Sequence, residues 1–223
     1  MKKLIIWDFD GVISNTEPLW VGAWADFFKH CYHLDYPYEF WYEMFAGVSN
    51  KTKFERVMDK FGLNVDVQEL IDYCGDSLHK NRAQITLTSG ILPLFETYDG
   101  CQCIATGDSV KNTFEKINIL HIGKFFDKEN IFSADMVERG KPAPDLFLYA
   151  AAHMGYEPSQ CIVIDDAVAG VQAAINAHME IIPFVEHHGS LKERMIDEIH
   201  ELGATQIADN MLDVKRMLKK ECL

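Results

Sequence analysis

Short apolar runs alternate with amphipathic stretches along most of the chain. Four runs of four or five residues, each bounded by polar or turn residues, predict buried strands at 4–7, 101–105, 161–164 and 181–184. The intervening sequence has helical character at 110–118, 145–154 and 167–177. Strands that alternate with helices predict βαβ units, so we expect an α/β fold with a doubly wound, Rossmann-like parallel sheet.

One long stretch breaks this alternation. From about Glu17 to Thr86 no convincing strand is visible, and aromatic residues such as Trp20, Trp24 and Phe27 recur at helical spacing. A helical region inserted after the first strand predicts a separate subdomain. We therefore expect a core domain of residues 1–15 and 87–223, a helical cap domain of residues 16–86, and a cleft between them that closes by hinges near 14–15 and 88–90.

The tail from residue 190 predicts a helix, a short strand at 206–208 and a final helix.

Composition and charge limit the function. The chain has 223 residues, 48% hydrophobic and 25% charged, which is typical of a globular protein with a sizeable core. A formal net charge of -13 repels nucleic acids and anionic lipids, so we expect neither as a partner. No apolar run is long enough for a signal peptide or a membrane span, and six cysteines lack zinc-finger spacing. We expect reduced cysteines and a cytoplasmic monomer or small homo-oligomer.

Polar residues follow the first two predicted strands. Asp8 and Asp10 lie two positions apart in D-F-D-G-V, so a strand end can present both carboxylates together. Thr106 follows the second run, and Gly107 then leads into a helix whose free N–H groups suit phosphate oxygens. Each motif alone also fits an ordinary turn or helix cap.

Two further clusters carry charge. Lys141 lies between glycine and prolines in G-K-P-A-P-D, which holds its ammonium in a defined loop where it could neutralise phosphate. Asp165 and Asp166 are adjacent acids at the end of a buried strand, where they repel each other. A bound divalent cation relieves that repulsion, and hard oxygen ligands favour Mg²⁺.

The order of these motifs is more specific than any one of them. D-x-D-G-V, a strand ending in Thr, K-P-x-P-D and a strand ending in D-D-x-x-x-G occur in that order over nearly the whole chain. In this the sequence resembles the haloacid dehalogenase-like (HAD-like) hydrolase superfamily, in the branch with a helical cap after the first strand. The resemblance implies a HAD core with an inserted cap.

The resemblance also implies a role for each residue. Asp8 would attack phosphorus to form an aspartyl-phosphate, and Asp10 would protonate the leaving oxygen and then activate water. Thr106 and Gly107 would bind phosphoryl oxygens, and Lys141 would offset their charge.

The same resemblance implies a magnesium cofactor. Its ligands would be Asp8, the backbone carbonyl of Asp10, Asp165 and Asp166. The implied activity is magnesium-dependent hydrolysis of a small phosphomonoester, with a sugar phosphate or related metabolite as the expected partner.

Three alternatives stay open. A phosphomutase of the beta-phosphoglucomutase type shares the cap, with a loop similar to Gly47-Val48-Ser49, but Asn50 stands here where the mutase has a phosphate-binding arginine. Ser49 and Asn50 are candidate substrate contacts in either enzyme. A catalytically retired binding scaffold would usually lack some of the polar residues, and all are present. A receiver-type signalling domain would place its acidic pair first rather than last.

Overall fold

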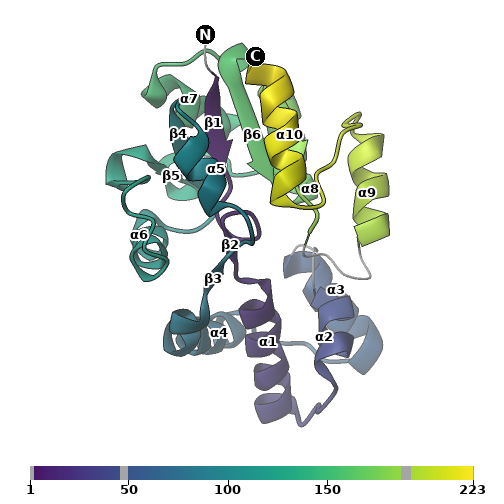
Figure 1. Ribbon diagram of the computed structural model, residues 1–223. Helices are drawn as coiled ribbons and strands as arrows, with labels where there is room; N and C mark the ends of the chain where they lie inside the picture. Colours follow the sequence, from purple (N-terminus) through teal and green to yellow (C-terminus); the bar gives the residue numbers. More distant parts are fainter. Residues whose placement is uncertain (1–2, 46–49, 187–191, 223) are drawn as a thin grey trace.

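The computed structural model describes residues 3–45, 50–186 and 192–222, and its centre is a five-stranded sheet (Figure 1). The strands are β1 (Leu4–Trp7), β4 (Gln102–Thr106), β5 (Ile131–Ser133), β6 (Cys161–Asp165) and β7 (Glu180–Pro183). Their order is β5-β4-β1-β6-β7, and all neighbouring pairs run parallel. Because β1 lies at the centre, the residues after it have strands on both sides.

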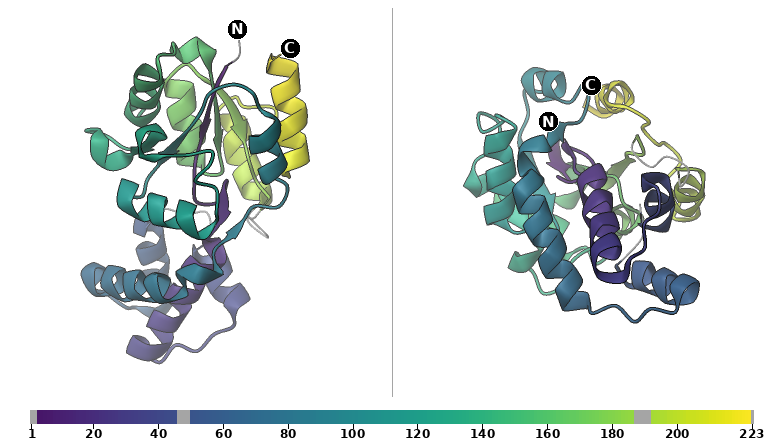
Figure 2. Two further views of the ribbon diagram at one scale, coloured as in Figure 1. Left: turned by 60° about the vertical axis from the view of Figure 1, so that its left-hand side comes forward. Right: turned by 90° about the horizontal axis from the view of Figure 1, so that it is seen from below.

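Helices cover both faces of this sheet (Figure 2). Ile5 and Trp7 of β1 face α5 (Leu92–Thr97), α6 (Val110–Ile119) and α10 (Met211–Cys222) in one apolar cluster. Leu4 and Ile6 face α7 (Asp145–Met154) and α8 (Val168–Asn176) in another. α9 (Lys192–Glu201) packs on the outside of α8. Burial on both faces explains why the strands are apolar runs without alternation. The predicted doubly wound α/β fold is confirmed.

A second group of helices lies beyond the ends to which the strands point (Figure 1). It comprises α1 (Glu17–Tyr32), α2 (Tyr38–Phe45), α3 (Asn50–Phe61) and α4 (Val67–Asn81). These helices share an apolar cluster of their own, in which Phe28 stacks on Trp41 with ring centroids 4.9 Å apart. A two-stranded antiparallel ribbon of β2 (Ser14–Asn15) and β3 (Thr86–Leu87) joins them to the sheet. Helices were predicted here, and the division into core and cap domains stays a prediction.

Several elements differ from the prediction, among them the ribbon of β2 and β3, which was not predicted. β5 was not predicted, because its three residues lie between 3₁₀ turns at Lys128–Asn130 and Ala134–Met136 and show no periodicity. The short helix α5 was also missed. The strand predicted at 206–208 is wrong, because only Ala208 forms a bridge, to Phe184 at the end of β7. Residues 206–207 are therefore part of a loop.

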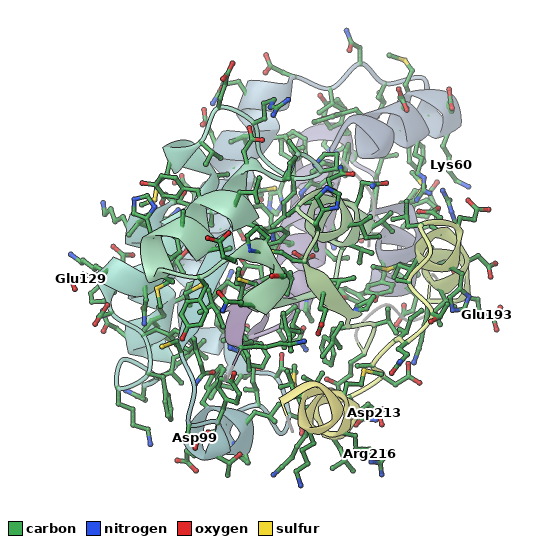
Figure 3. All side chains as sticks on the ribbon, turned by 90° about the horizontal axis from the view of Figure 1, so that it is seen from above. Lys60, Asp99, Glu129, Glu193, Asp213 and Arg216 are labelled. Carbon is green, nitrogen blue, oxygen red and sulfur yellow. The ribbon has the colours of Figure 1, made fainter. Side chains whose placement is uncertain are left out.

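Several charged side chains of the helices lie on the outside of the molecule. In Figure 3, Glu129, Asp213 and Arg216 point away from the sheet, and Arg216 pairs with Asp213 at 3.0 Å. The described helices include none long and apolar enough to cross a bilayer. The five cysteines whose side chains are described form no disulfide with one another.

Candidate active site

Four neighbouring strands end in a buried polar residue. Ser133 ends β5, Thr106 ends β4, Asp8 follows β1 and Asp165 ends β6, and each is less than a tenth exposed. Polar groups at the end of an apolar sheet are costly to bury unless they are paired. Ligands bind at the carboxyl ends of the strands in such sheets. This edge, which faces α1–α4, is therefore the candidate site.

Lys141 joins two of the strand ends. Its Nζ donates to Asp8 Oδ1 at 2.5 Å and to Asp165 Oδ2 at 2.6 Å. The ammonium also lies 5.1 Å from the centre of the Phe147 ring. Lys141 comes from the loop before α7, where Asp145 and Arg139 form a two-bond ion pair that fastens the loop to the start of the helix.

Burial and charge together set the ionisation of this pair. Burial raises the pKa of Asp8 to about 7, and the neighbouring charge of Asp165 adds to the rise although Lys141 opposes it. For Lys141, burial acts to lower the pKa, but the charges of Asp165 and Asp8 outweigh it, so its pKa lies above the ordinary value. Burial and the charge of Asp165 thus favour the neutral form of Asp8 by more than Lys141 offsets.

Glycines allow the paired acids to approach the sheet edge closely. A Cβ on Gly11 would lie 1.9 Å from Asp166 Oδ2, and a φ of +92° at Gly11 also favours glycine. A Cβ on Gly170 would lie 1.9 Å from the carboxyl carbon of Asp165. These close approaches place Asp166 against the loop that carries Asp10, and place the Asp165 carboxyl group against Gly170 of α8.

Asp10 is held by residues that the sequence did not single out. Lys116 Nζ donates to both Asp10 oxygens at 2.7 Å, and Thr16 Oγ1 donates to Asp10 Oδ1 at 2.9 Å. Lys116 also pairs with Asp108 at 3.0 Å. The eight-residue spacing of Asp108 and Lys116 is compatible with one helix face, but only the fold shows that this face meets Asp10.

The loop after β4 surrounds Thr106. Thr106 Oγ1 accepts from the backbone N–H of Asp108 at 3.1 Å, and Ser133 Oγ donates to the Asp108 carbonyl at 2.8 Å. Ser109 caps α6 by accepting from the Asn112 N–H at 3.2 Å. Added to Gly107, a Cβ would meet nothing within 4 Å, so this part of the loop is open. The arrangement leaves room for an anion over Thr106, and its binding there stays a prediction.

The donor set at the sheet edge fits magnesium in part. Among the described residues no three His, Cys, Asp or Glu side chains are arranged to hold a metal. Both Asp165 oxygens already accept hydrogen bonds, from Lys141 and from the Ala167 N–H at 2.9 Å. Asp8, Asp166 and the carbonyl of Asp10 are oxygen donors of the kind Mg²⁺ takes with several waters. Two carboxylates and a carbonyl suit that ion, whereas a ligand role for Asp165 would require a change of partner.

Ser49 and Asn50, the predicted substrate contacts of the cap, stay predictions. Ser49 lies outside the described residues, and Asn50 is described only as the first residue of α3. A hollow of about 580 Å³ lies in this region, lined by Phe40, Glu43, Met44, Arg56, Asp59 and Lys60. Its cations are engaged: Arg56 donates to the carbonyls of Glu43 and Met44, and Lys60 lies over the Phe40 ring. No residue of the sheet edge lines it, so the chemistry is assigned to the strand ends.

Comparison with known proteins identifies the family. The model of the haloacid dehalogenase-like hydrolases matches residues 5–184, which include all five strands of the sheet except Leu4, the first residue of β1. The chain belongs to this family. The prediction of a HAD-like hydrolase is thereby confirmed, and phosphatases among its relatives support the predicted class of phosphoric monoester hydrolase.

The relatives of this HAD-like chain align with most of its length. Fructose-1-phosphate phosphatase YqaB of Escherichia coli is 27% identical over 180 residues, which is 80% of this chain and 94% of that protein. Beta-phosphoglucomutase of Bacillus subtilis is 29% identical over 193 residues, 79% of this chain and 80% of the mutase. A conserved haloacid dehalogenase-like protein of Agrobacterium tumefaciens has the same fold, with a TM-score of 0.86, 23% identity and full coverage of both chains.

Proposed function

We propose that this HAD-like protein is a magnesium-dependent phosphatase that hydrolyses a small phosphomonoester through an aspartyl-phosphate on Asp8. The observation that carries the proposal is Lys141, whose ammonium bonds Asp8 at 2.5 Å and Asp165 at 2.6 Å at the carboxyl end of the central strand. A carboxylate held beside a fixed cation can approach a phosphoryl dianion, which it would otherwise repel.

In the first half of the reaction, an Asp8 oxygen attacks phosphorus. The bond from phosphorus to the ester oxygen breaks as the bond to Asp8 forms, and Asp10 gives a proton to the leaving alcohol. Thr106, at the end of the next strand, donates to a phosphoryl oxygen, and its backbone neighbour Gly107 leaves space for that oxygen.

In the second half, water attacks the phosphorus of the aspartyl-phosphate. Asp10, now a carboxylate, takes the proton from this water, and the bond between Asp8 and phosphorus breaks. Inorganic phosphate leaves, and both carboxyl groups return to their starting states. Lys141 stays beside Asp8 throughout and offsets charge on the phosphoryl group.

Asp8, Asp166 and the carbonyl of Asp10 would hold the magnesium ion, with Asp165 as a further candidate. When bound, Mg²⁺ supplies positive charge to the phosphoryl oxygens. The elevated pKa of Asp8, about 7 because of burial, supports the need for a cation at this edge.

The substrate class we propose is a sugar phosphate. The support is that two relatives matching most of the chain are named fructose-1-phosphate phosphatase and beta-phosphoglucomutase. We further propose that residues 16–86 act as a cap domain over the strand ends, with Ser49 and Asn50 facing the substrate. Its helices have their own apolar cluster and connect through the short ribbon of β2 and β3.

Phosphate release with Mg²⁺ across sugar phosphates, polyol phosphates, 6-phosphogluconate and nucleotides tests the proposal. Wild type should release phosphate from at least one sugar phosphate, and Asp8→Asn should reduce release to background. Asp197→Asn, an exposed change on α9, is the matched control. Beta-glucose 1-phosphate is included for the mutase alternative, because isomerisation without net phosphate release would replace hydrolysis by phosphoryl transfer within the substrate. No turnover of any compound would favour a retired scaffold.

A further inference from the structure

Lys116, which the sequence did not single out, contacts two carboxyl groups and an aromatic ring. Its Nζ lies 2.7 Å from both oxygens of Asp10 and 3.0 Å from Asp108 Oδ2. The same ammonium is 5.4 Å from the centre of the Phe9 ring, and the side chain is only 15% exposed. A lysine loses rotamer freedom and hydration in such a position. These costs are offset because three carboxylate oxygens interact with the ammonium group.

Asp108 holds the ammonium group of Lys116 in place. Asp108 Oδ1 accepts from the backbone N–H of Ser109 at 2.7 Å and from Asn112 Nδ2 at 3.0 Å, which leaves Oδ2 to bond Lys116. Asp108, Asn112 and Lys116 succeed one another at intervals of four residues along α6 and the turn before it. The position of the ammonium is therefore set by the helix rather than by a flexible stem.

Thr16 is a second hydrogen-bond donor to the Asp10 carboxyl group. It is the N-cap residue of α1, yet its hydroxyl makes no capping hydrogen bond and donates to Asp10 Oδ1 instead. A threonine cap is worth about 1 kcal/mol to a helix. The contact with Asp10 replaces that cap, so this carboxyl group is held between α6 of the core and the first helix of the inserted region.

We infer that Lys116 is a positioning residue that fixes the orientation of the Asp10 carboxyl group for proton transfer to the leaving oxygen. The inference rests on the proposed function. An ammonium only donates hydrogen bonds, and Asp10 Oδ1 already accepts from both Lys116 and Thr16, so the oxygen with a lone pair left for a proton is Oδ2. Without Lys116 the carboxyl group can rotate about its χ2 bond, and Thr16 alone holds one oxygen.

The leaving group separates this role from a merely structural one. An alkyl oxygen must receive a proton as it leaves, whereas a nitrophenolate leaves without one. A misdirected acid therefore slows kcat/KM on an alkyl phosphate and spares kcat/KM on p-nitrophenyl phosphate. Loss of a cation that merely attracts phosphate, or general loosening of the loop, slows both substrates alike.

The experiment compares kcat/KM on a sugar phosphate and on p-nitrophenyl phosphate for wild type, Lys116→Met and Lys116→Arg. We expect Lys116→Met to lose about 10- to 100-fold on the sugar phosphate and less than about 3-fold on the aryl ester. Lys116→Arg keeps the charge and should recover most of the loss. Lys111→Met, an exposed change on the same helix, should leave both values unchanged.

A double-mutant cycle with Asp10→Asn completes the test. If Lys116 acts through Asp10, adding Lys116→Met to Asp10→Asn should cause no further loss. Equal losses on both substrates, no loss, or additive losses in the cycle would overturn the inference while wild-type turnover upholds the proposed function. If Lys116→Met does not fold, Asp108→Asn, which removes the charge that holds Lys116 in place, is compared on the two esters instead. Wild type that hydrolyses neither ester would overturn the proposed function, and the inference with it.

Discussion

Without metal, the stability advantage of Asp8→Asn over the wild type should grow as pH rises. Burial holds the pKa of Asp8 at about 7, whereas its ordinary value is 3.8. Below both values Asp8 carries a proton whether folded or unfolded, so its contribution to stability is fully present. As pH rises through the window between them, the unfolded chain releases the proton and the folded chain keeps it, so stability is lost until the folded pKa is passed.

The magnitude follows from the width of that window. Each pH unit corresponds to about 1.4 kcal/mol, so from about pH 5 to pH 7 the wild type should lose about 3 kcal/mol relative to Asp8→Asn. Above pH 7 the difference should level off. Asparagine cannot ionise, so the variant lacks this proton-linked loss and Lys141 keeps its bond to Asp165.

Urea unfolding followed by circular dichroism measures the difference, with a chelator present so that no cation binds the carboxylates. Both proteins are unfolded at several pH values from about 5 to 8, together with Asp197→Asn as an exposed control. The control should track the wild type at every pH. A gap between wild type and Asp8→Asn that stays flat, or that narrows as pH rises, would refute the reasoning.

Three further predictions address the neighbours of Asp8. Gly170→Ala pushes a methyl group into the Asp165 carboxyl group, so kcat/KM should fall at least about 10-fold, whereas Gly75→Ala, in open space on α4, should keep activity and add about 0.5–1 kcal/mol of stability. Lys141→Gln leaves two buried carboxylates without their cation, so urea unfolding should show a loss of about 3–5 kcal/mol, and turnover should drop about 100-fold. A chelator should abolish phosphate release, which added Mg²⁺ should restore; undiminished turnover in chelator would contradict the metal proposal.

The sequence was most informative where a strand ends in a polar residue. Asp8, Thr106 and Asp165 each follow or end an apolar run, and parallel strands bring their carboxyl ends to one edge. That rule alone predicts their convergence. Lys141 was placed in a rigid loop by its flanking prolines, and the structure adds that this loop reaches both acids.

Side-chain pairings between distant elements were not predictable. Lys116 and Asp10 are separated by 106 positions, and nothing local in the sequence shows which face of α6 meets the first strand. Thr16 looks like an ordinary helix cap until its hydroxyl is found on Asp10. Both contacts depend on the packing of helices against the sheet edge, which periodicity does not specify. β5 was missed for a different reason, because three residues are too few to show a pattern.

The most direct test of the mechanism is to find the phosphoryl group on the enzyme. Wild type, Asp8→Asn and Asp10→Asn are each mixed with p-nitrophenyl phosphate, whose leaving group needs no proton from Asp10, and are then quenched in acid within milliseconds, digested and mapped by mass spectrometry. The account predicts a phosphoryl group on the peptide at Asp8, enriched in Asp10→Asn because the second half of the reaction lacks its base, and absent from Asp8→Asn. Turnover without any phosphorylated peptide, or with the label on another residue, would contradict it.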